Sequence, residues 1–438
     1  HIAGLSRSGN RMRRAILVKT STSRLQNISK RSLVLSAAQL EQKGAVRELT
    51  NKNTRNLGSY TKLVAAPQSL DTPTYCATGG TKFDAGSILA QPIREKISNY
   101  TSKLLRDGKE LPSMVAFLAN ENPSSKLFID LFNNCCNEDG VKLEVVRVNE
   151  SEIEQAVHVA NEDPNIHGIL VCYPIFDPHE TTSLSKFCRL TGDYLSRDDK
   201  LRDTVQAKKD VEGLGHTYNR PHIDASHVVH PDGASDATKE ITPCTAEAIM
   251  KCLASVPGAY NEFLPHTKRM DGLTVTIVNR SPLYGHPLAV MLSNEGAEVY
   301  SVALNSIYHF KDFKYHKVEA DLETCTRSSN ILITGVPDSD FHIPSSWIQP
   351  HSIVVNMSEY DNVSMDSVLG VPGTVYVTGV GKLSRAILRR NLVRLHKTYH
   401  TDDVDDDING KAVENSASGG IYSDISLAQR IFQSLSLT

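Results

Sequence analysis

Residues 273–302 read LTVTIVNRSPLYGHPLAVMLSNEGAEVYSV, and this stretch decides the fold class of the chain. Its apolar run Leu273–Asn279 predicts a buried strand, and Arg280–Gly285 forms the loop that follows. His286–Glu295 then predicts a helix, and Glu298–Val302 predicts the next strand. A strand–helix–strand unit of about 30 residues has the size of a dinucleotide-binding module in a parallel sheet.

The same alternation of strands and helices extends to both sides of this unit. Three apolar runs are expected to continue its sheet: Ile331–Thr334, Ile353–Asn356 and Tyr376–Thr378. An earlier group alternates in the order Met114–Asn120, Ser124–Glu138, Leu143–Val148, Ile153–Ala160 and His167–Pro174. Thr245 is expected to cap a further helix. Because such alternation produces parallel sheets with right-handed crossovers, the chain is predicted to be an α/β protein.

The loop of the 273–302 unit lacks the G-x-G-x-x-G pattern. It reads Asn279-Arg280-Ser281, and Gly285 and Pro287 follow at a short distance. The helix N-terminus still offers N–H groups and a positive dipole to a pyrophosphate, Ser281 adds a hydroxyl and Arg280 adds charge. The alternative is that Arg280 is an ordinary surface cation.

The composition argues against several classes of protein. Lys and Arg number 47 against 50 Asp and Glu, and the resulting net charge of -3 argues against a nucleic-acid-binding protein. No stretch approaches ~18 consecutive apolar residues, so no membrane span is expected. The 8 cysteines include no C-x-x-C pair and are too sparse for a disulfide scaffold. We therefore expect no metal site and a reducing compartment.

The charge is unevenly distributed along the chain. Residues 1–66 hold 13 Lys and Arg but two acidic residues, which gives this segment a net charge of +11. Together with the Arg-, Ser- and Leu-rich stretch Met12–Ser36, this composition resembles a transit peptide, mitochondrial first and plastid second. A basic disordered arm on a cytoplasmic protein is the alternative. Residues 1–80 are assigned to this leader and its linker, and residues 401–438 to an acidic linker and tail.

Seven short motifs occur in one order along the middle of the chain. They are Asn122-Pro-Ser-Ser125, Gly168-Ile-Leu-Val171, Lys209-Asp-Val-Glu-Gly213, Pro243-Cys-Thr245, the loop that begins with Asn279-Arg-Ser281, Ile333-Thr-Gly-Val-Pro337 and Gly379-Val-Gly381. In this order and spacing they resemble the methylenetetrahydrofolate dehydrogenase/cyclohydrolase family over roughly residues 82–398. Asn279, where bifunctional relatives usually carry glycine, resembles the monofunctional NAD-dependent branch found in fungi.

This resemblance implies two α/β lobes. A folate-binding catalytic domain would span residues 81–244, a Rossmann-type NAD(P)-binding domain 245–382, and a helix over 383–400 would return to the first lobe. The implied protein is a homodimer in one-carbon metabolism and purine biosynthesis. It oxidises 5,10-methylenetetrahydrofolate to 5,10-methenyltetrahydrofolate by hydride transfer to NAD. The adjacent nitrogen stabilises the cation that forms, so the protein mainly supplies alignment and a dry site.

The resemblance also implies roles for individual residues. Asp210 would be the catalytic and substrate-binding carboxylate that grips the amino edge of the pterin, and its alternative role is a turn within its own loop. Gly379 and Gly381 would let the backbone approach the folate. The residues expected to bind the cofactor are Asn279, Arg280, Ser281, Gly285, Asn305, Gly335, Val336 and Pro337.

Three positions depart from the bifunctional relatives, which carry a Tyr-x-x-x-Lys pair and a Gln that supports the Lys. This chain has Phe128, Phe132 and Cys172 there. Phe128 and Cys172 would still line the substrate site, but Phe132 offers neither a proton nor a charge, so cyclohydrolase activity is expected to be absent. One alternative is that both phenylalanines are core residues in a catalytically impaired folate- or nucleotide-binding protein. The other is a bifunctional NADP-dependent enzyme.

Cofactor choice depends on the residues after the strand Glu298–Val302. An acidic residue there would hold the NAD ribose, and a basic one would hold the 2′-phosphate of NADP. Ala303, Leu304 and Asn305 supply neither, and the next basic residue is Lys311. NAD is expected from the resemblance, and NADP is less favoured.

Overall fold

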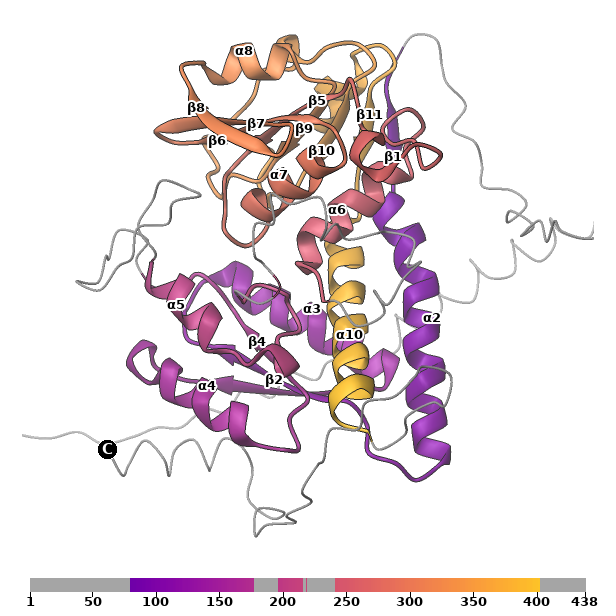
Figure 1. Cartoon of the computed structure of the whole chain (residues 1–438), viewed down its shortest axis with the longest axis vertical. Helices are drawn as coiled ribbons and strands as arrows, with labels where there is room; N and C mark the ends of the chain where they lie inside the picture. The colour runs from indigo at the N-terminus through magenta and orange to yellow at the C-terminus, as the bar shows by residue number, and fades with distance from the viewer. Residues whose placement is uncertain (1–78, 177–195, 216–217, 219–240, 402–438) are drawn as a thin grey trace, which may run out of the picture. The chain divides into compact units, whose positions relative to one another are not determined.

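The computed structural model describes residues 79–176, 196–215, 218 and 241–401 (Figure 1). The predicted leader up to residue 78 and the predicted tail from residue 402 lie outside these residues. The α/β class is confirmed, with one three-stranded and one eight-stranded sheet in the described part of the chain. No helix in these ranges is long and apolar enough to span a membrane. No group of three His, Cys, Asp or Glu residues among them is placed to hold a metal ion.

The first lobe is built on the three-stranded parallel sheet. Its strands β2 (Ser113–Leu118), β3 (Lys142–Arg147) and β4 (Gly168–Val171) lie in the order β3-β2-β4. Each strand and helix predicted for this group is present, with shifted ends. The helices and short turns of the lobe are α3 (Pro123–Asp139), η1 (Glu150–Glu152), α4 (Ile153–Glu162), α5 (Arg197–Thr204) and η2 (Ala207–Lys209).

Helix α3 shows how local sequence sets an element in this lobe. The Asn122 side chain accepts a hydrogen bond from Ser124 N at 2.9 Å, and Pro123 occupies the first turn. Gly140 ends the helix with a left-handed φ of 72°, which glycine adopts at the lowest cost. These signals fix α3 so that Ile129 and Phe132 are buried in the core.

The second lobe is built on the eight-stranded sheet, in the order β1-β11-β10-β9-β5-β6-β7-β8. Neighbouring strands from β1 to β6 are parallel, and β6, β7 and β8 are antiparallel. The predicted strand–helix–strand unit and its three continuing strands are confirmed. The elements are β1 (Thr81–Phe83), β5 (Thr274–Val278), α7 (Gly285–Asn294), β6 (Glu298–Ala303), β7 (Ser306–Lys311), β8 (Lys314–Val318), α8 (Leu322–Arg327), β9 (Ile331–Thr334), η6 (Ser345–Trp347), β10 (Ile353–Asn356), α9 (Met365–Leu369) and β11 (Val375–Val377), with η5 (His266–Lys268) before β5.

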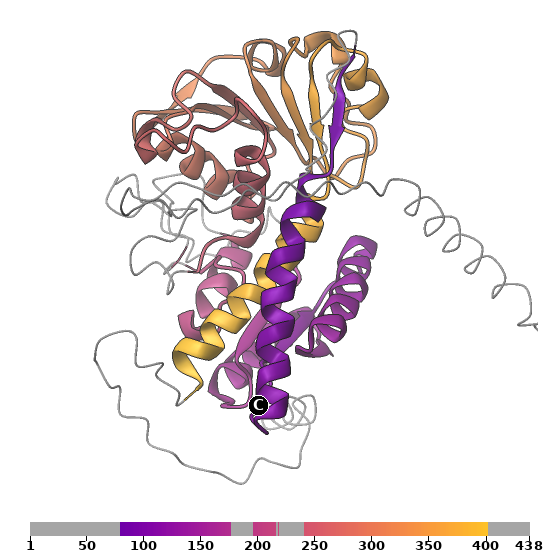
Figure 2. The same cartoon turned by 90° about the vertical axis from the view of Figure 1, so that its right-hand side faces the viewer.

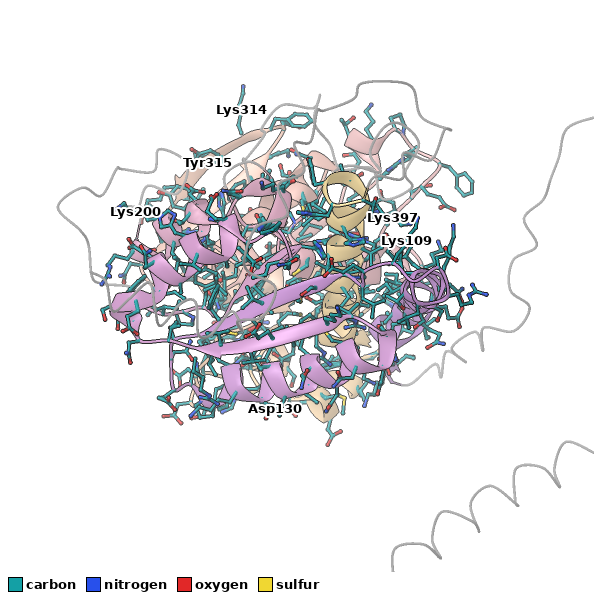
Figure 3. All side chains as sticks on the ribbon, turned by 90° about the horizontal axis from the view of Figure 1, so that it is seen from below. Lys109, Asp130, Lys200, Lys314, Tyr315 and Lys397 are labelled. Carbon is teal, nitrogen blue, oxygen red and sulfur yellow. The ribbon has the colours of Figure 1, made fainter. Side chains whose placement is uncertain are left out.

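Two parts of this sheet differ from the sequence-based expectation. Strand β1, which the sequence assigns to the first domain, pairs with β11 of the second lobe, because three residues carry too little periodicity to reveal their sheet. Strands β7 and β8 form an unpredicted hairpin. Its turn residues Asp312 and Phe313 have positive φ angles of 50° and 59° without the usual glycine signal. Lys314 on β8 points outward (Figure 3), and an exposed charge there discourages edge-to-edge pairing.

Two long helices, α2 (Ala85–Arg106) and α10 (Val380–Tyr399), pack against each other (Figure 2). Helix α10 corresponds to the predicted helix 383–400 and contacts α3 and β4 of the first lobe. The sequence did not indicate α2, because Pro92 lies inside it and proline usually ends a helix.

Helix α6 (Cys244–Ala254) also packs on α10. It begins after Pro243, without a side-chain cap. The prediction that Thr245 caps this helix is therefore wrong. The Thr245 hydroxyl instead lies 2.9 Å from the Ser384 hydroxyl of α10, so the residue joins two helices.

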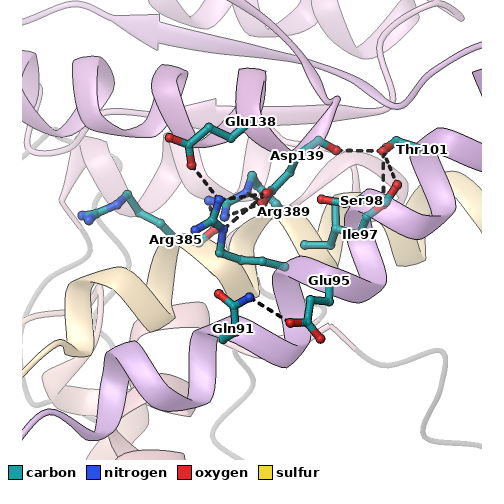
Figure 4. Close-up of polar contacts among 10 residues, drawn as sticks. Gln91, Glu95, Ile97, Ser98, Thr101, Glu138, Asp139, Arg385 and Arg389 are labelled. Atoms are coloured by element: carbon teal, nitrogen blue, oxygen red, sulfur yellow. Dashed lines mark hydrogen bonds and ion pairs between the residues drawn. The ribbon is translucent and has the colours of Figure 1, made fainter. Parts of the chain in front are cut away.

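A buried ion pair fixes α10 to α3 (Figure 4). Arg389 Nε donates to Asp139 Oδ2 at 2.8 Å, and both side chains are 1% exposed. Arg94 of α2 donates to the other oxygen of the same carboxylate at 3.3 Å, and the Thr101 hydroxyl donates to the Asp139 carbonyl at 2.8 Å. Asp139 therefore links the three helices α2, α3 and α10.

Candidate functional site

The order in which the chain adds strands to the sheet of the second lobe reverses at β5. From β5 the chain continues through α7 to β6 on one side, and later returns to β9 on the other side. In open α/β sheets, ligands bind outside the carboxyl ends of the strands at such a switch point. The predicted cofactor residues Asn279 and Gly335 directly follow β5 and β9 and lie in contact here, since Asn279 Nδ2 donates to the Gly335 carbonyl at 2.6 Å.

The loop between β5 and α7 owes its close turn to two residues. Asn279 has a φ of 104°, in the left-handed region that glycine favours and asparagine tolerates. A Cβ atom at Gly285 would collide with the Asn279 carbonyl, so only glycine lets α7 start this close to the strand. Within the loop, Ser281 Oγ accepts a hydrogen bond from Leu283 N at 3.1 Å. The Ser281 carbonyl accepts from His286 N in the first turn of α7 at 2.9 Å, so Ser281 lies beside the start of α7, where the sequence predicts a phosphate contact.

The structure directs the Arg280 guanidinium toward β6 and β7. Its Nη2 atom donates to the Ser306 hydroxyl at 2.5 Å, and its Cζ atom lies 4.6 Å from the centre of the Tyr308 ring. This is the end of β6 and the start of β7, where the ribose of a bound dinucleotide lies in folds of this type. Asn305 is exposed in the two-residue turn between the same strands. Arg280 and Asn305 are thus brought to one edge, and Arg280 is placed for the ribose side more than for the pyrophosphate.

The loop Gly335–Pro337, called the 335–337 loop below, is held by a residue that the sequence analysis did not identify. Asn362 is fully buried. Its Oδ1 atom accepts from Val336 N at 2.8 Å and its Nδ2 atom donates to the Val336 carbonyl at 3.0 Å. The Ser358 hydroxyl also donates to that carbonyl, at 2.8 Å. No sequence motif marks Asn362, because its partners lie 26 residues earlier and are recognised only after β9 and β10 pair.

In the first lobe, residues 209–215 form a loop beside β4 that is called the 209–215 loop below. Asp210 Oδ1 accepts from Gly213 N at 2.9 Å and Oδ2 accepts from Gly215 N at 2.8 Å. Burial raises the pKa of this carboxyl, and the hydrogen bonds from the backbone amides oppose the rise. Asp210 is 4% exposed. This geometry corresponds to the alternative role in which Asp210 organises its own turn.

Lys209, the first residue of the same motif, is also used inside the protein. It is 1% exposed, and its Nζ atom donates to the carbonyls of Ala160 at 2.9 Å and Asp163 at 2.6 Å. These carbonyls belong to the C-terminal end of α4, where a cation is favoured by the helix dipole. Lys209 therefore attaches the 209–215 loop to α4.

Glu212 is a second carboxyl in this loop, and the sequence analysis did not select it. Burial raises its pKa to about 8, and the nearby Asp210 carboxylate adds to the rise. Its Oε2 atom lies 3.5 Å from Val171 N, at the outer limit of a hydrogen bond. Because both Asp210 oxygens are taken by amides, Glu212 is the carboxyl better placed to meet a ligand. Its position in the same motif, two residues after Asp210, was the sequence signal that could have marked Glu212 as a site residue.

Two cysteine thiols and a tyrosine lie near Glu212. Cys172 follows β4 and is 6% exposed, and burial raises the pKa of its thiol to about 12, followed by a contribution from Glu212. Burial and then Glu212 likewise raise the pKa of Cys244 to about 12. Tyr173 lies under the Arg202 guanidinium, whose Cζ atom is 5.4 Å from the ring centre. Cys172 is thus a neutral thiol beside a carboxyl and has no ionised form to act as a nucleophile near neutral pH.

The two phenylalanines of α3 stack on each other, with ring centres 5.7 Å apart and an angle of 8° between the planes. Phe132 is fully buried and belongs to the core, as the alternative interpretation holds. Phe128 is partly buried and packs against that core. Of this pair, Phe128 alone retains exposed ring surface for a substrate.

The surroundings of Gly379 give a reason for glycine at this position that is separate from its predicted role in letting the backbone approach the folate. Gly379 has a φ of 80°, and a Cβ atom there would collide with the Asp84 side chain. A Cβ atom at Gly86 would in turn collide with the Gly379 carbonyl. Glycine at 379 therefore permits α2 and α10 to start in backbone contact. Gly381 is exposed, and only the Arg385 guanidinium lies near its Cβ position, at 3.6 Å.

One contact joins the two groups of candidate residues. The Ser124 hydroxyl, in the first turn of α3, donates to Glu359 Oε1 at 2.5 Å. Glu359 follows Ser358, which holds Val336, and Ser124 precedes Phe128 by one helical turn. This hydrogen bond therefore connects α3 to the segment that holds the 335–337 loop.

These features define a two-lobed α/β protein with a topological switch point in the sheet of one lobe and the neighbouring carboxyls of Asp210 and Glu212 in the other. The family model described as tetrahydrofolate dehydrogenase/cyclohydrolase, catalytic domain, matches residues 85–190. An NAD-dependent methylenetetrahydrofolate dehydrogenase of Dictyostelium discoideum is 34% identical over 71% of this chain and 94% of its own length. An enzyme of the same name from Schizosaccharomyces pombe is 32% identical over 65% of this chain and 84% of its own length.

The solved structure of the NAD-dependent 5,10-methylenetetrahydrofolate dehydrogenase from Saccharomyces cerevisiae is also similar. It has a TM-score of 0.60 and 28% identity, and the match covers 73% of this chain and 98% of that structure. The chain belongs to the tetrahydrofolate dehydrogenase/cyclohydrolase family. The predicted family, and the predicted pair of α/β lobes with a Rossmann-type lobe, are confirmed.

Proposed function

We propose that this protein oxidises 5,10-methylenetetrahydrofolate to 5,10-methenyltetrahydrofolate with transfer of a hydride to NAD, and that it lacks cyclohydrolase activity. The observation that carries the proposal is the contact between the loops after β5 and β9 at the switch point of the sheet, where the dinucleotide crevice of such folds lies. The chain is also 31–34% identical to three NAD-dependent dehydrogenases of this name. Relatives with this name and the similar NAD-dependent structure from Saccharomyces cerevisiae support NAD over NADP.

The residues on the two sides of the site would divide the work. NAD bound in the crevice supplies the hydride acceptor, and the nitrogen next to the one-carbon bridge stabilises the cation that forms. Glu212 would accept N–H groups of the pterin in its ionised form, and Phe128 would stack on a ring of the substrate. The protein thus contributes orientation and exclusion of water, and needs no proton transfer for this step.

The absence of cyclohydrolase activity is proposed from the side chains available to activate water. Phe128 and Phe132 have no titratable group, and the stacked pair occupies the face of α3 that leads to the core. Burial raises the pKa of the Cys172 thiol to about 12, so it remains neutral and cannot serve as a base near pH 7. Among these three positions nothing can generate hydroxide at the methenyl carbon.

The proposal is tested by following NADH and methenyltetrahydrofolate formation by absorbance, with NAD or NADP as the acceptor. We expect turnover with NAD, accumulation of the methenyl product, and weaker turnover with NADP. Methenyltetrahydrofolate added to the enzyme should decay at the buffer rate. Faster decay would reveal a cyclohydrolase, and no turnover with either nucleotide would leave a binding protein.

We also propose a homodimer and import into a mitochondrion. The dimer is carried over from the family resemblance, and import from the +11 charge of residues 1–66. Sedimentation equilibrium of the purified protein checks the first. A fluorescent reporter fused to residues 12–66 checks the second, because a diffuse cytosolic or a plastid signal would contradict it.

A further inference from the structure

The carbonyl of Gly335 receives two side-chain donors from one distant loop. Asn279 Nδ2 lies 2.6 Å from the Gly335 oxygen, and the Tyr284 hydroxyl lies 3.2 Å from the same oxygen. Both donors belong to the loop after β5, more than 50 residues earlier in the chain. The 335–337 loop is therefore tied across the switch point to the loop that starts α7.

Tyr284 and Gly335 are sterically matched as well as hydrogen-bonded. A Cβ atom at residue 335 would collide with the Tyr284 hydroxyl oxygen and would lie 3.0 Å from the ring carbon that carries it. Burial raises the pKa of the Tyr284 phenol above its ordinary value, so the phenol remains a protonated donor at any working pH. The glycine is thus needed to admit the tyrosine, in addition to any need to admit a ligand.

The next peptide of the same loop is fixed from the other side. Asn362 holds both the N–H and the carbonyl of Val336, and Asn362 Oδ1 also accepts from the Thr334 hydroxyl at 3.1 Å. Side chains therefore bind the polar groups of two successive residues of the loop. Tyr284 and Asn279 bind the Gly335 carbonyl, and Asn362 binds the N–H and the carbonyl of Val336. Such over-determined loops are the ones that can present a ligand site without reorganising on binding.

We propose that Tyr284 is a positioning residue for the dinucleotide: with Asn279 it clamps the Gly335 carbonyl and so holds the 335–337 loop in the position in which it would contact a bound dinucleotide. Asn279 then acts through this loop, whereas the sequence predicts direct contact with the cofactor. The inference rests on the proposed NAD binding and adds to it the residues that shape the crevice.

The test compares Tyr284→Phe, Asn279→Gly and the double variant with the wild-type chain. Phenylalanine removes only the hydroxyl, and glycine removes the amide while keeping the positive φ of residue 279 free of strain. Loss of one hydrogen bond should make the NAD dissociation constant of each single variant about three- to tenfold larger. The Michaelis constant for the folate should change less than twofold. Tyr260→Phe is the matched control, because it loses a hydrogen bond from Arg269 in the same lobe, outside the crevice.

Two further readouts separate positioning from general stability. Fluorescence of bound NADH should show a less immobilised nicotinamide in Tyr284→Phe while the thermal unfolding midpoint stays close to that of Tyr260→Phe. Gly335→Ala should weaken NAD binding strongly in the wild-type background and less in the Tyr284→Phe background, because the collision with the hydroxyl is gone.

If the wild-type chain binds NAD, and both single variants keep its NAD affinity and its NADH fluorescence, the positioning role of Tyr284 is wrong while the proposed function stands. Additive effects of Tyr284→Phe and Gly335→Ala would lead to the same conclusion. A wild-type chain that binds neither NAD nor NADP would overturn the proposed function together with this role. If Tyr284→Phe fails to fold, Asn279→Gly decides by the same NAD measurements.

Discussion

The 209–215 loop of the first lobe and the 335–337 loop of the second are held by different kinds of group. Charged side chains hold the first: Asp210 binds two backbone amides and Lys209 binds two backbone carbonyls. Neutral side chains hold the second: Asn279, Tyr284, Asn362 and Ser358. A buried charge that loses its partner costs more free energy than a buried amide or phenol that loses one. The ionisation of a buried carboxyl also changes with pH, whereas amides do not titrate and a phenol titrates only at high pH. The 209–215 loop should therefore be more sensitive to mutation and to pH than the 335–337 loop.

The largest effect is expected where the buried Asp139 carboxylate loses the closer of its two arginine partners, Arg389 and Arg94. Arg389→Met removes the guanidinium from Asp139, which is 1% exposed, and should lower the free energy of unfolding by about 3–5 kcal/mol. Urea unfolding measures this change. Arg327→Met is the control, because it removes an exposed pair with Glu323 and should cost less than about 0.5 kcal/mol. Equal losses in the two variants would erase the contrast between buried and exposed charges.

A smaller loss is expected from the 209–215 loop itself. Asp210→Ala leaves two buried amides without acceptors and should destabilise the protein by about 2–3 kcal/mol. Folate affinity should fall with it, because Glu212 sits in the same loop, while NAD affinity measured by titration should survive. A variant of unchanged stability that binds no folate would instead give Asp210 the direct pterin contact predicted from the sequence.

The ionisation of Glu212 predicts that activity toward the folate depends on pH. Its pKa is raised to about 8, so the carboxylate is the minor form at pH 7 and the major form at pH 9. If the ionised form binds the pterin, kcat/KM for the folate should rise about tenfold from pH 7 to pH 9. The Glu212→Gln variant should show a low, flat profile. A wild-type profile that falls over this range would mean that the protonated carboxyl is the binding form.

The smallest effect is expected on the nucleotide side. Burial, followed by Arg280, lowers the pKa of His286 to about 4, and Tyr284 stays protonated because burial raises its pKa. The NAD dissociation constant should therefore change less than about twofold between pH 6 and pH 9. Titration at constant ionic strength measures it. A steep pH dependence would reveal a titrating group in the crevice and remove the contrast between the two lobes.

Much of the site could be located from sequence because its anchors are local. The loop from Asn279 to Gly285 occupies one strand–helix junction, and Asp210 bonds to amides within five residues of itself. The turn role of Asp210 was accordingly among the alternatives that the sequence offered. Arg280 was assigned to the phosphate because it precedes α7, and only the pairing of β6 with β7 shows its guanidinium at Ser306.

Local sequence patterns were enough to predict the α/β class, the strands of both sheets apart from β1 and the β7–β8 hairpin, and the family motifs. Periodicity, caps and short motifs are properties of neighbouring residues, and they need no knowledge of the sheet order. The tertiary structure alone decided that Asn362 holds Val336, that Tyr284 and Asn279 meet at Gly335, and that Glu212 is the less occupied carboxyl. These contacts join residues whose nearness is set by strand order and helix packing, which local patterns do not encode.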